Sequence, residues 1–191
     1  MPVEKEYKYI TTPELAKSYL EKNGDKYIKQ EINQGYLFKD DNSCLRLRKT
    51  IQCGPDGLIP SYEMTYKRFV NNEVVEIENN VDKEDFHKLW GVCTSRISKT
   101  RYLNTHSDSD VKISIDLFHS LADLKKTYFA LIEIENPTTE SIKEEIEKYG
   151  NLKNIVTVFV SSEDQKLLTN TKLCCEQYAH AIYAKLIIKD I

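Results

Sequence analysis

The chain has 191 residues, of which 40% are hydrophobic and 30% are charged, which is enough apolar material for a core and excludes a disordered chain. The 27 basic and 30 acidic side chains nearly balance, so the chain lacks the basic excess that is typical of nucleic-acid binding. It also lacks a basic amphipathic tract of the kind that binds a membrane surface. We expect one domain over residues 1–191, with a core of about residues 1–150. Residues 151–191 are expected to form an extension, a strand and a C-terminal helix packed on the core.

The N-terminal residues 1–9 are charged and contain no apolar segment, so they do not resemble a signal peptide. The longest apolar runs, such as Ile155–Val160, are too short to span a bilayer. Five scattered cysteines without CxxC spacing argue against a disulfide framework and against a thiolate zinc site. We therefore expect a soluble, cytoplasmic protein that is a monomer or a homodimer.

Strand-like stretches recur along the chain, rich in Tyr, Ile, Val, Leu or Thr and often alternating as half-buried strands do. In order they are Val3–Tyr9, Tyr27–Lys39, Cys44–Gln52, Tyr62–Phe69, Glu73–Val81, Val92–Leu103, Val111–Phe118 and Tyr128–Asn136. Turn-forming residues separate them, for example Gly54-Pro55-Asp56-Gly57. The pattern predicts an antiparallel sheet that closes, or nearly closes, into a barrel. We expect an α+β fold that is mainly β, a closed eight-stranded antiparallel β-barrel with flanking helices.

Helices are expected between these strands. The first begins at Thr12, a good N-cap before Pro13, and Gly24 offers a stop. Two further helices are expected over Asp82–Trp90 and Thr139–Tyr149, and in the extension a strand over Ile155–Val160 and a helix within Lys166–Lys189.

Charged residues recur two positions apart in the expected strands, so their side chains share one face of each strand. The sets are Glu4, Glu6 and Lys8; Arg46 and Arg48; Glu76 and Glu78; Lys99 and Arg101; Glu133 and Glu135; and, singly, Lys67 and Asp116. For any one strand, a solvated outer surface explains such a face. Most sets, however, contain charges of one sign, and like charges side by side repel unless something lies between them.

A charged barrel interior explains this sorting better than an outer surface does. Arg binds phosphate oxygens through two hydrogen bonds and Lys adds a compact charge, so the basic residues suit a polyphosphate. The acidic residues suit oxygen ligation of Mg²⁺ or Mn²⁺, which bridges carboxylate and phosphate. Such a site hydrolyses by positioning, by charge neutralisation and by activation of water at the metal.

Glu4-Lys5-Glu6-Tyr7-Lys8 is an ExExK motif, and it resembles the hallmark of the CYTH superfamily, also called triphosphate tunnel metalloenzymes. Matching motifs follow in order: Gln34-Gly35-Tyr36-Leu37, Leu45-Arg46-Leu47-Arg48, Thr65-Tyr66-Lys67, Glu76-Ile77-Glu78, Lys99-Thr100-Arg101, Ile115-Asp116 and Glu133-Ile134-Glu135. The resemblance implies an eight-stranded barrel around a tunnel and action on triphosphorylated substrates with Mg²⁺ or Mn²⁺. Known activities of the family are inorganic triphosphatase, thiamine triphosphatase, class IV adenylyl cyclase and RNA 5′-triphosphatase.

The resemblance also implies roles for individual residues. The implied metal ligands are Glu4 and Glu6 with Glu133 or Glu135. The implied phosphate binders are Lys8, Arg46, Arg48, Lys67, Lys99 and Arg101. Glu76, Glu78 and Asp116 correspond to acids that hold a second metal or orient water. Lys99 would help to activate the attacking water only if its pKa were depressed.

Hydrolysis of a small-molecule triphosphate, with inorganic tripolyphosphate favoured, is the first hypothesis, because every assigned residue addresses phosphate or metal. A class IV adenylyl cyclase would use the same residues to make cyclic AMP and pyrophosphate, and a thiamine triphosphatase would need a thiazole pocket. A non-catalytic polyphosphate binder would bind without turnover, but carboxylates in the tunnel argue against it. A carrier of an apolar ligand is disfavoured because its interior should not be charged.

Overall fold

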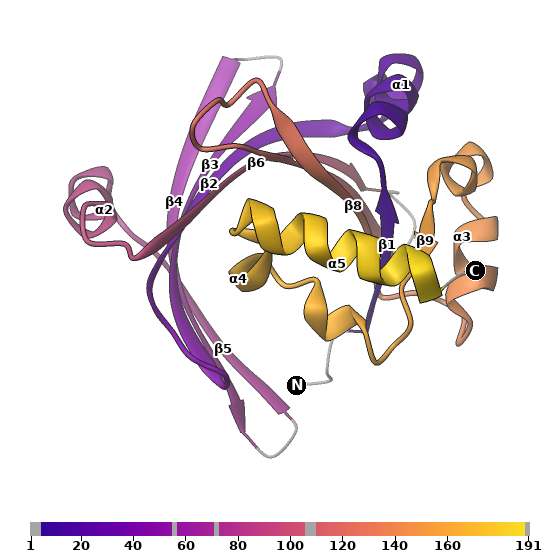
Figure 1. Ribbon diagram of the computed structural model, residues 1–191. Coiled ribbons are helices and arrows are strands. Elements are labelled where there is room, and N and C mark those ends of the chain that lie inside the picture. Colours follow the sequence, from indigo (N-terminus) through magenta and orange to yellow (C-terminus); the bar gives the residue numbers. More distant parts are fainter. Residues whose placement is uncertain (1–4, 55–56, 71–72, 106–109, 190–191) are drawn as a thin grey trace.

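The computed structural model describes residues 5–54, 57–70, 73–105 and 110–189. Its centre is a nine-stranded antiparallel sheet in the order β5-β4-β3-β2-β6-β7-β8-β1-β9 (Figure 1). The strands are β1 (Glu6–Thr11), β2 (Ile28–Lys39), β3 (Ser43–Gly54), β4 (Gly57–Val70), β5 (Glu73–Asn80), β6 (Ser95–Thr105), β7 (Lys112–His119), β8 (Thr127–Glu135) and β9 (Val158–Phe159). The helices are α1 (Pro13–Asn23), α2 (Lys83–Trp90), α3 (Ile142–Glu147), α4 (Asn170–Leu173) and α5 (Glu176–Lys189), with 3-10 turns η1 (Gly24–Lys26), η2 (Gly150–Ile155) and η3 (Gln165–Leu167).

The eight predicted strands are confirmed as β1 to β8, but the predicted closed barrel is wrong. Among the described strands, β5 pairs only with β4, while β1 pairs with β8 on one edge and with β9 on the other. β9 comes from the C-terminal extension, and its Val158 pairs with Ile10. The N–H of Thr157 also donates to the carbonyl of Ile10 at 2.8 Å. The extension therefore occupies the edge of β1 that would have to meet β5 for the sheet to close.

The first helix begins at the predicted cap, Thr12, and the second follows Asp82, the residue at which its predicted range begins. The hydroxyl of Thr12 accepts a hydrogen bond from the N–H of Leu15 at 3.2 Å, and Asp82 accepts one from the N–H of Asp85 at 2.8 Å. The third helix, α3, is shorter than predicted, and the single helix predicted within Lys166–Lys189 is divided into η3, α4 and α5. Within the described part of the chain, no helix has the length and apolarity needed to cross a membrane.

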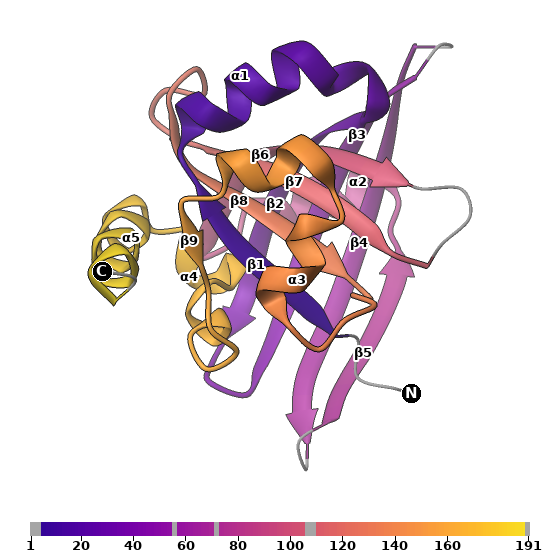
Figure 2. The ribbon, with the colours of Figure 1, turned by 90° about the vertical axis from the view of Figure 1, so that its right-hand side faces the viewer.

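Helices cover the convex face of the sheet. The elements α1, α3 and η2 lie over β1, β7 and β8 (Figure 2). Their buried contacts include Tyr9, Leu20, Ile115, Ile132, Ile146 and Leu152. Elsewhere on the convex face, α2 packs over β2, β3 and β4, where a close approach requires glycine: a Cβ at Gly35 would lie 2.7 Å from the sulfur of Cys93.

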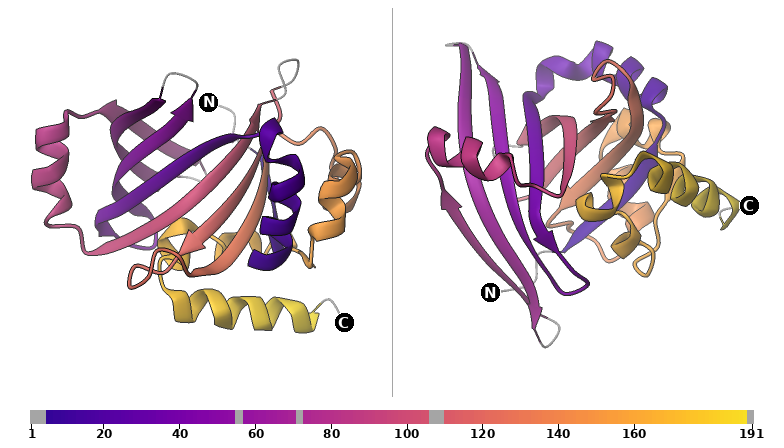
Figure 3. Two further views of the ribbon diagram at one scale, coloured as in Figure 1. Left: turned by 90° about the horizontal axis from the view of Figure 1, so that it is seen from above. Right: turned by 60° about the vertical axis from the view of Figure 1, so that its left-hand side comes forward.

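The short helix α4 and the longer α5 lie at one end of the concave face (Figures 1 and 3). Leu168, Leu173, Ile182 and Leu186 pack there against Ile10, Ile97, Phe118 and Leu131. Two strands hold α4 by hydrogen bonds. The hydroxyl of Tyr128 donates to the carbonyl of Leu173 at 2.7 Å, and Lys39 donates to the carbonyl of Thr171 at 2.8 Å. The apolar end of the concave face is therefore covered, which leaves its polar part for the site.

Candidate functional site

The register of the strands places the predicted charged residues on one face of the sheet. Residues paired across an antiparallel ladder point to the same side. From β1 to β5 the pairs are Glu6 with Glu135, Lys8 with Glu133, Leu131 with Asp116, Asp116 with Arg101, Arg101 with Gln30, Gln34 with Arg48, Arg48 with Glu63, Thr65 with Glu78 and Lys67 with Glu76. Leu131 also packs with the residues of α4 and α5, so this face is the concave one.

We call this surface the charged concave face. Its charged residues are Glu6, Lys8, Arg46, Arg48, Glu63, Lys67, Glu76, Glu78, Lys99, Arg101, Lys112, Asp116, Glu133 and Glu135. Every described residue that the motifs assigned to phosphate, metal or catalysis belongs to it. The alternation of the sequence therefore brings the predicted site residues together, although the sheet is open.

A buried ion-pair network joins β6, β7 and β8. Asp116 is 0% exposed and accepts two hydrogen bonds from Arg101, each of 2.7 Å. It accepts a third from Lys99 at 2.5 Å. Arg101 also donates to Glu133 at 2.8 Å. One carboxylate thus fixes two of the predicted phosphate binders.

Burial and neighbouring charges shift the pKa values in this network. Burial, followed by the charge of Arg101, lowers the pKa of Lys99 to about 8. Burial alone would raise the pKa of Asp116, but Arg101 and Lys99 outweigh it and hold that pKa well below its usual range. Burial raises the pKa of Glu133 despite the opposing charge of Arg101. Lys99 therefore gains or loses its proton much nearer neutral pH than an ordinary lysine does.

A second network joins β2, β3 and β4. Arg46 donates to the carboxylate of Glu63 at 3.1 Å and to the hydroxyl of Thr65 at 2.7 Å. Arg48 donates through Nε to the side-chain oxygen of Gln34 at 3.3 Å, and its nearest contact with Glu63 is 3.8 Å. The Nε of Arg46 is buried and has no hydrogen-bond partner among the described residues. A buried donor without a partner is costly, which favours a ligand or water at this position.

The two networks influence each other. Burial, then the charge of Arg46 and, from the first network, that of Arg101 lower the pKa of Arg48 to about 10 against the opposing charge of Glu63. A hydrogen bond with Glu63 raises the pKa of Glu78 on the neighbouring strand. Lys67 and Glu76 form a separate ion pair at 2.7 Å. The crowded positive charges around Arg48 would be relieved by an anion.

The predicted metal ligands occupy neighbouring positions on β1 and β8, except Glu4, which lies outside the described residues. Glu6 lies directly opposite Glu135, and Glu133 is the next residue along on the same side. The Glu6 carboxylate contacts Lys8, and Glu135 lies 3.7 Å from Lys112. Nowhere in the described ranges do three or more His, Cys, Asp or Glu side chains form a group suited to a metal. The donor type and the adjoining positions nevertheless fit Mg²⁺ or Mn²⁺, which prefer carboxylate oxygen.

Sequence reasoning missed several polar residues of the charged concave face. Glu63 lies four residues before Lys67 in the same alternation, so the spacing that identified Lys67 also points to Glu63. Gln34 belongs to a motif but received no role. Asn170, from α4, accepts a hydrogen bond from Lys99 at 3.4 Å. No sequence pattern could have found Asn170, because its position depends on how the extension folds back.

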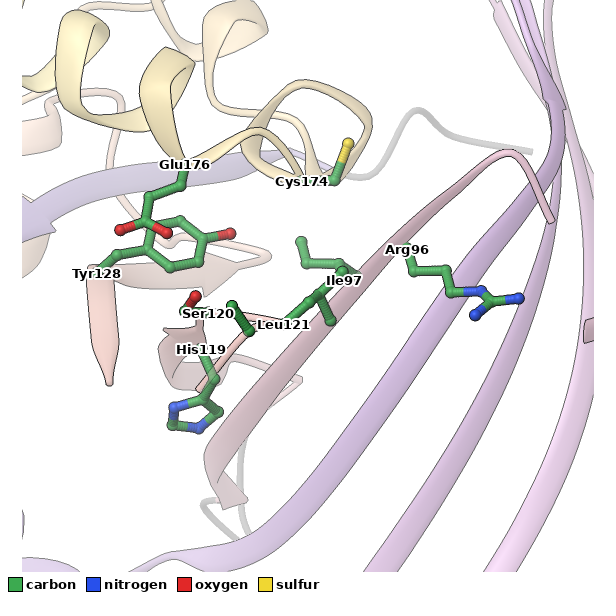
Figure 4. Close-up of a pocket in the computed structure, with 9 residues that line it drawn as sticks. Arg96, Ile97, His119, Ser120, Leu121, Tyr128, Cys174 and Glu176 are labelled. Atoms are coloured by element: carbon green, nitrogen blue, oxygen red, sulfur yellow. The ribbon is translucent and has the colours of Figure 1, made fainter. Parts of the chain in front are cut away.

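A pocket of about 220 Å³ lies apart from these residues, between the start of β6, the β7–β8 turn and the segment that joins α4 to α5 (Figure 4). It is lined by Arg96, Ile97, His119, Ser120, Leu121, Ala122, Tyr128, Cys174 and Glu176. None of these residues was predicted for the site. The chemistry indicated by the sequence therefore belongs to the charged concave face and not to this pocket.

Solved structures show the same fold. The PH1819 protein from Pyrococcus horikoshii OT3 matches with a TM-score of 0.51 and 22% identity, over 80% of this chain and 89% of that chain. A putative adenylate cyclase from Bacillus halodurans matches with a TM-score of 0.51 and 14% identity, over 87% of this chain and 98% of that chain. No family model matches the sequence, and no curated protein matches it either. At these identities the likeness establishes a shared fold, which is consistent with the CYTH-like fold that the motifs imply.

Proposed function

We propose that this chain belongs to the CYTH superfamily and hydrolyses a triphosphate on the charged concave face with Mg²⁺ or Mn²⁺, inorganic tripolyphosphate being the favoured substrate. One observation carries the proposal: the cations that the motifs assign to phosphate come from four strands and share one face of the sheet. They are Lys8, Arg46, Arg48, Lys67, Lys99 and Arg101. A linear polyanion needs such a spread of cations on a continuous surface.

Acids of the same face explain why a metal is needed. Five of the six cations contact a carboxylate of this face directly, and Arg48 has one at 3.8 Å, so a bare polyanion would meet repulsion from the acids. A divalent ion held by Glu4 and Glu6 with Glu133 or Glu135, the ligands that the motifs imply, would neutralise part of that negative charge and leave the cations to the substrate. It would also supply positive charge beside the phosphate oxygens during hydrolysis.

The chain's own residues then bind and orient the substrate. Arg46 and Arg48 are suited to bind phosphate oxygens through paired N–H groups. Asp116 accepts hydrogen bonds from Lys99 and Arg101 and so fixes the positions of both positive charges before the substrate binds. Lys99, with a pKa of about 8, can hold or accept a proton near neutral pH. Glu76 and Glu78 are the acids we assign to orienting the attacking water.

Product identification tests the proposal. The purified protein is incubated with tripolyphosphate, ATP or thiamine triphosphate, each with Mg²⁺ or Mn²⁺, and orthophosphate release from tripolyphosphate is the expected result. Cyclic AMP and pyrophosphate from ATP would instead identify an adenylyl cyclase, the activity in the description of the Bacillus halodurans structure. Binding without any product would identify a polyphosphate binder.

The metal-ligand assignment has its own test. Glu6→Gln should abolish turnover while the far-UV circular dichroism spectrum stays that of the parent. Glu140→Gln is the matched control, because Glu140 is an exposed acid that pairs with Lys5 outside the charged concave face. Full activity of the Glu6 variant would remove Glu6 from the metal ligands.

A further inference from the structure

We infer that Gln34 is a positioning residue for Arg48: it orients the guanidinium toward an anion without cancelling its charge. The inference rests on the proposed function, because it concerns how the same face binds phosphate. Gln34 is 0% exposed and lies on the concave side of β2. It pairs with Arg48 of β3 on one side and with Ile97 of β6 on the other. Backbone pairing with β3 on one side and β6 on the other therefore fixes the main chain from which the side-chain amide of Gln34 extends.

The amide of Gln34 makes two hydrogen bonds. Its oxygen accepts from Nε of Arg48 at 3.3 Å, and its nitrogen donates to the hydroxyl of Tyr36 at 2.5 Å. Tyr36 is itself 2% exposed, so the partner that holds the amide is also buried. Because the guanidinium is planar, a bond to Nε sets the direction of its two remaining nitrogens.

Neutrality distinguishes Gln34 from the partners of the other cations. Among the described residues, Arg46, Lys67, Lys99 and Arg101 each have a carboxylate oxygen within 3.1 Å, and Lys8 contacts Glu6 directly. The nearest carboxylate of Arg48 is 3.8 Å away, and its closest side-chain partner is the amide. A carboxylate at this position would orient Arg48 equally well but would offset its charge. An amide orients the same group and leaves the charge available to phosphate.

Two substitutions separate orientation from charge. Gln34→Leu removes the acceptor, and we expect KM for tripolyphosphate with Mg²⁺ to rise about tenfold, the loss of one hydrogen bond to a charged group, with kcat little changed. Labelling of Arg48 by phenylglyoxal, followed by peptide mass spectrometry, should become faster because the guanidinium is no longer held. Gln34→Glu keeps an acceptor, so labelling should stay slow while KM remains raised about tenfold or more. If Gln34 had a purely structural role, KM and the rate of Arg48 labelling would change together in both variants.

The neighbour of Gln34 on β2 offers a matched control. Asn33→Ala alters the adjacent residue, which points to the opposite side of β2, and should change neither KM nor labelling. If Gln34→Leu does not fold, Tyr36→Phe, which removes only the hydroxyl behind the amide, replaces it and should raise KM about threefold. Parent-like KM and labelling in Gln34→Leu, or a parent-like KM in Gln34→Glu, overturn the inference. A parent protein that turns over no triphosphate overturns the proposed function instead, and the labelling rates alone then decide whether Gln34 holds Arg48.

Discussion

Asp116→Asn removes the carboxylate that holds two cations in the interior of the charged concave face. Asp116 is 0% exposed, and the side chains of Lys99 and Arg101 that it contacts are 1% and 16% exposed. Removing one partner of a buried ion pair costs about 3–5 kcal/mol, because the remaining charge stays buried without compensation. We therefore expect the free energy of unfolding to fall by about 3–5 kcal/mol. For a chain of this length the thermal midpoint should fall by roughly 6–20 °C.

Urea unfolding of the parent and the variant at neutral pH measures this loss, provided that each transition is two-state. Glu140→Gln is the control: its ion pair with Lys5 is exposed to solvent, so this substitution should leave the urea midpoint close to that of the parent. A loss below about 1 kcal/mol in Asp116→Asn would refute the reasoning, since Lys99 and Arg101 would then be stable without their carboxylate.

The same substitution has a defined pH dependence. Burial alone would raise the pKa of Asp116, but Arg101 and Lys99 lower it below the ordinary value of 3.8. A carboxylate with a lowered pKa in the folded state stabilises fully above its unfolded-state pKa, and that contribution is lost as the pH falls toward the folded-state pKa. The stability difference between parent and variant should therefore stay constant down to about pH 5 and narrow below about pH 4. A difference that does not narrow contradicts the assignment.

Three further predictions concern other parts of the molecule. Burial and Arg101 lower the pKa of Lys99 to about 8, so a Lys99 that binds phosphate as a cation should lose this charge as the pH rises through about 8. The value of kcat/KM for a triphosphate should then fall over the same pH range; a rise in kcat/KM instead would identify Lys99 as a proton acceptor. Gly35→Ala brings a Cβ within 2.7 Å of Cys93 Sγ and should cost about 1–3 kcal/mol in urea unfolding, partly recovered in a Cys93→Ala background; an unchanged midpoint would disprove the close packing. Thr157→Pro removes the N–H that bonds to Ile10 and should cost about 1–3 kcal/mol, whereas parent-like thermal stability would show that β9 does not hold the edge of β1.

The sequence predicts β1 to β8 well because each strand carries its own alternation. In β3, for example, Arg46 and Arg48 face one side and Leu47 the other, and this pattern follows from strand geometry alone. Closure of the sheet is not a local property. It depends on Thr157 reaching Ile10 across 147 residues, and no periodicity encodes such a contact. The predicted barrel was therefore wrong at the edge of β1, where β9 of the extension pairs in place of β5.

Within the site, the positions of the charges were predictable but their partners were not. Alternation placed Lys99, Arg101 and Asp116 on one face, yet only the register brings Asp116 opposite Arg101. Gln34 was overlooked because a neutral side chain carries no charge pattern, although it is the closest side-chain partner of Arg48. Asn170 depends on the folded extension, whose helix was predicted as one element and is divided in the structure.

The open edge of β5 should be visible in hydrogen exchange. In an antiparallel edge strand only alternate amides bond to the neighbouring strand, and the others point away from the sheet. Among the described strands β5 has β4 alone as a neighbour, whereas β7 lies between β6 and β8 and has a ladder on both sides. Outward amides of β5 should therefore exchange rapidly, while those of β7 exchange only when the sheet unfolds. Glu76 and Glu78 thus belong to the least restrained strand of the charged concave face, and their carboxylates can shift with the backbone while Asp116 remains fixed.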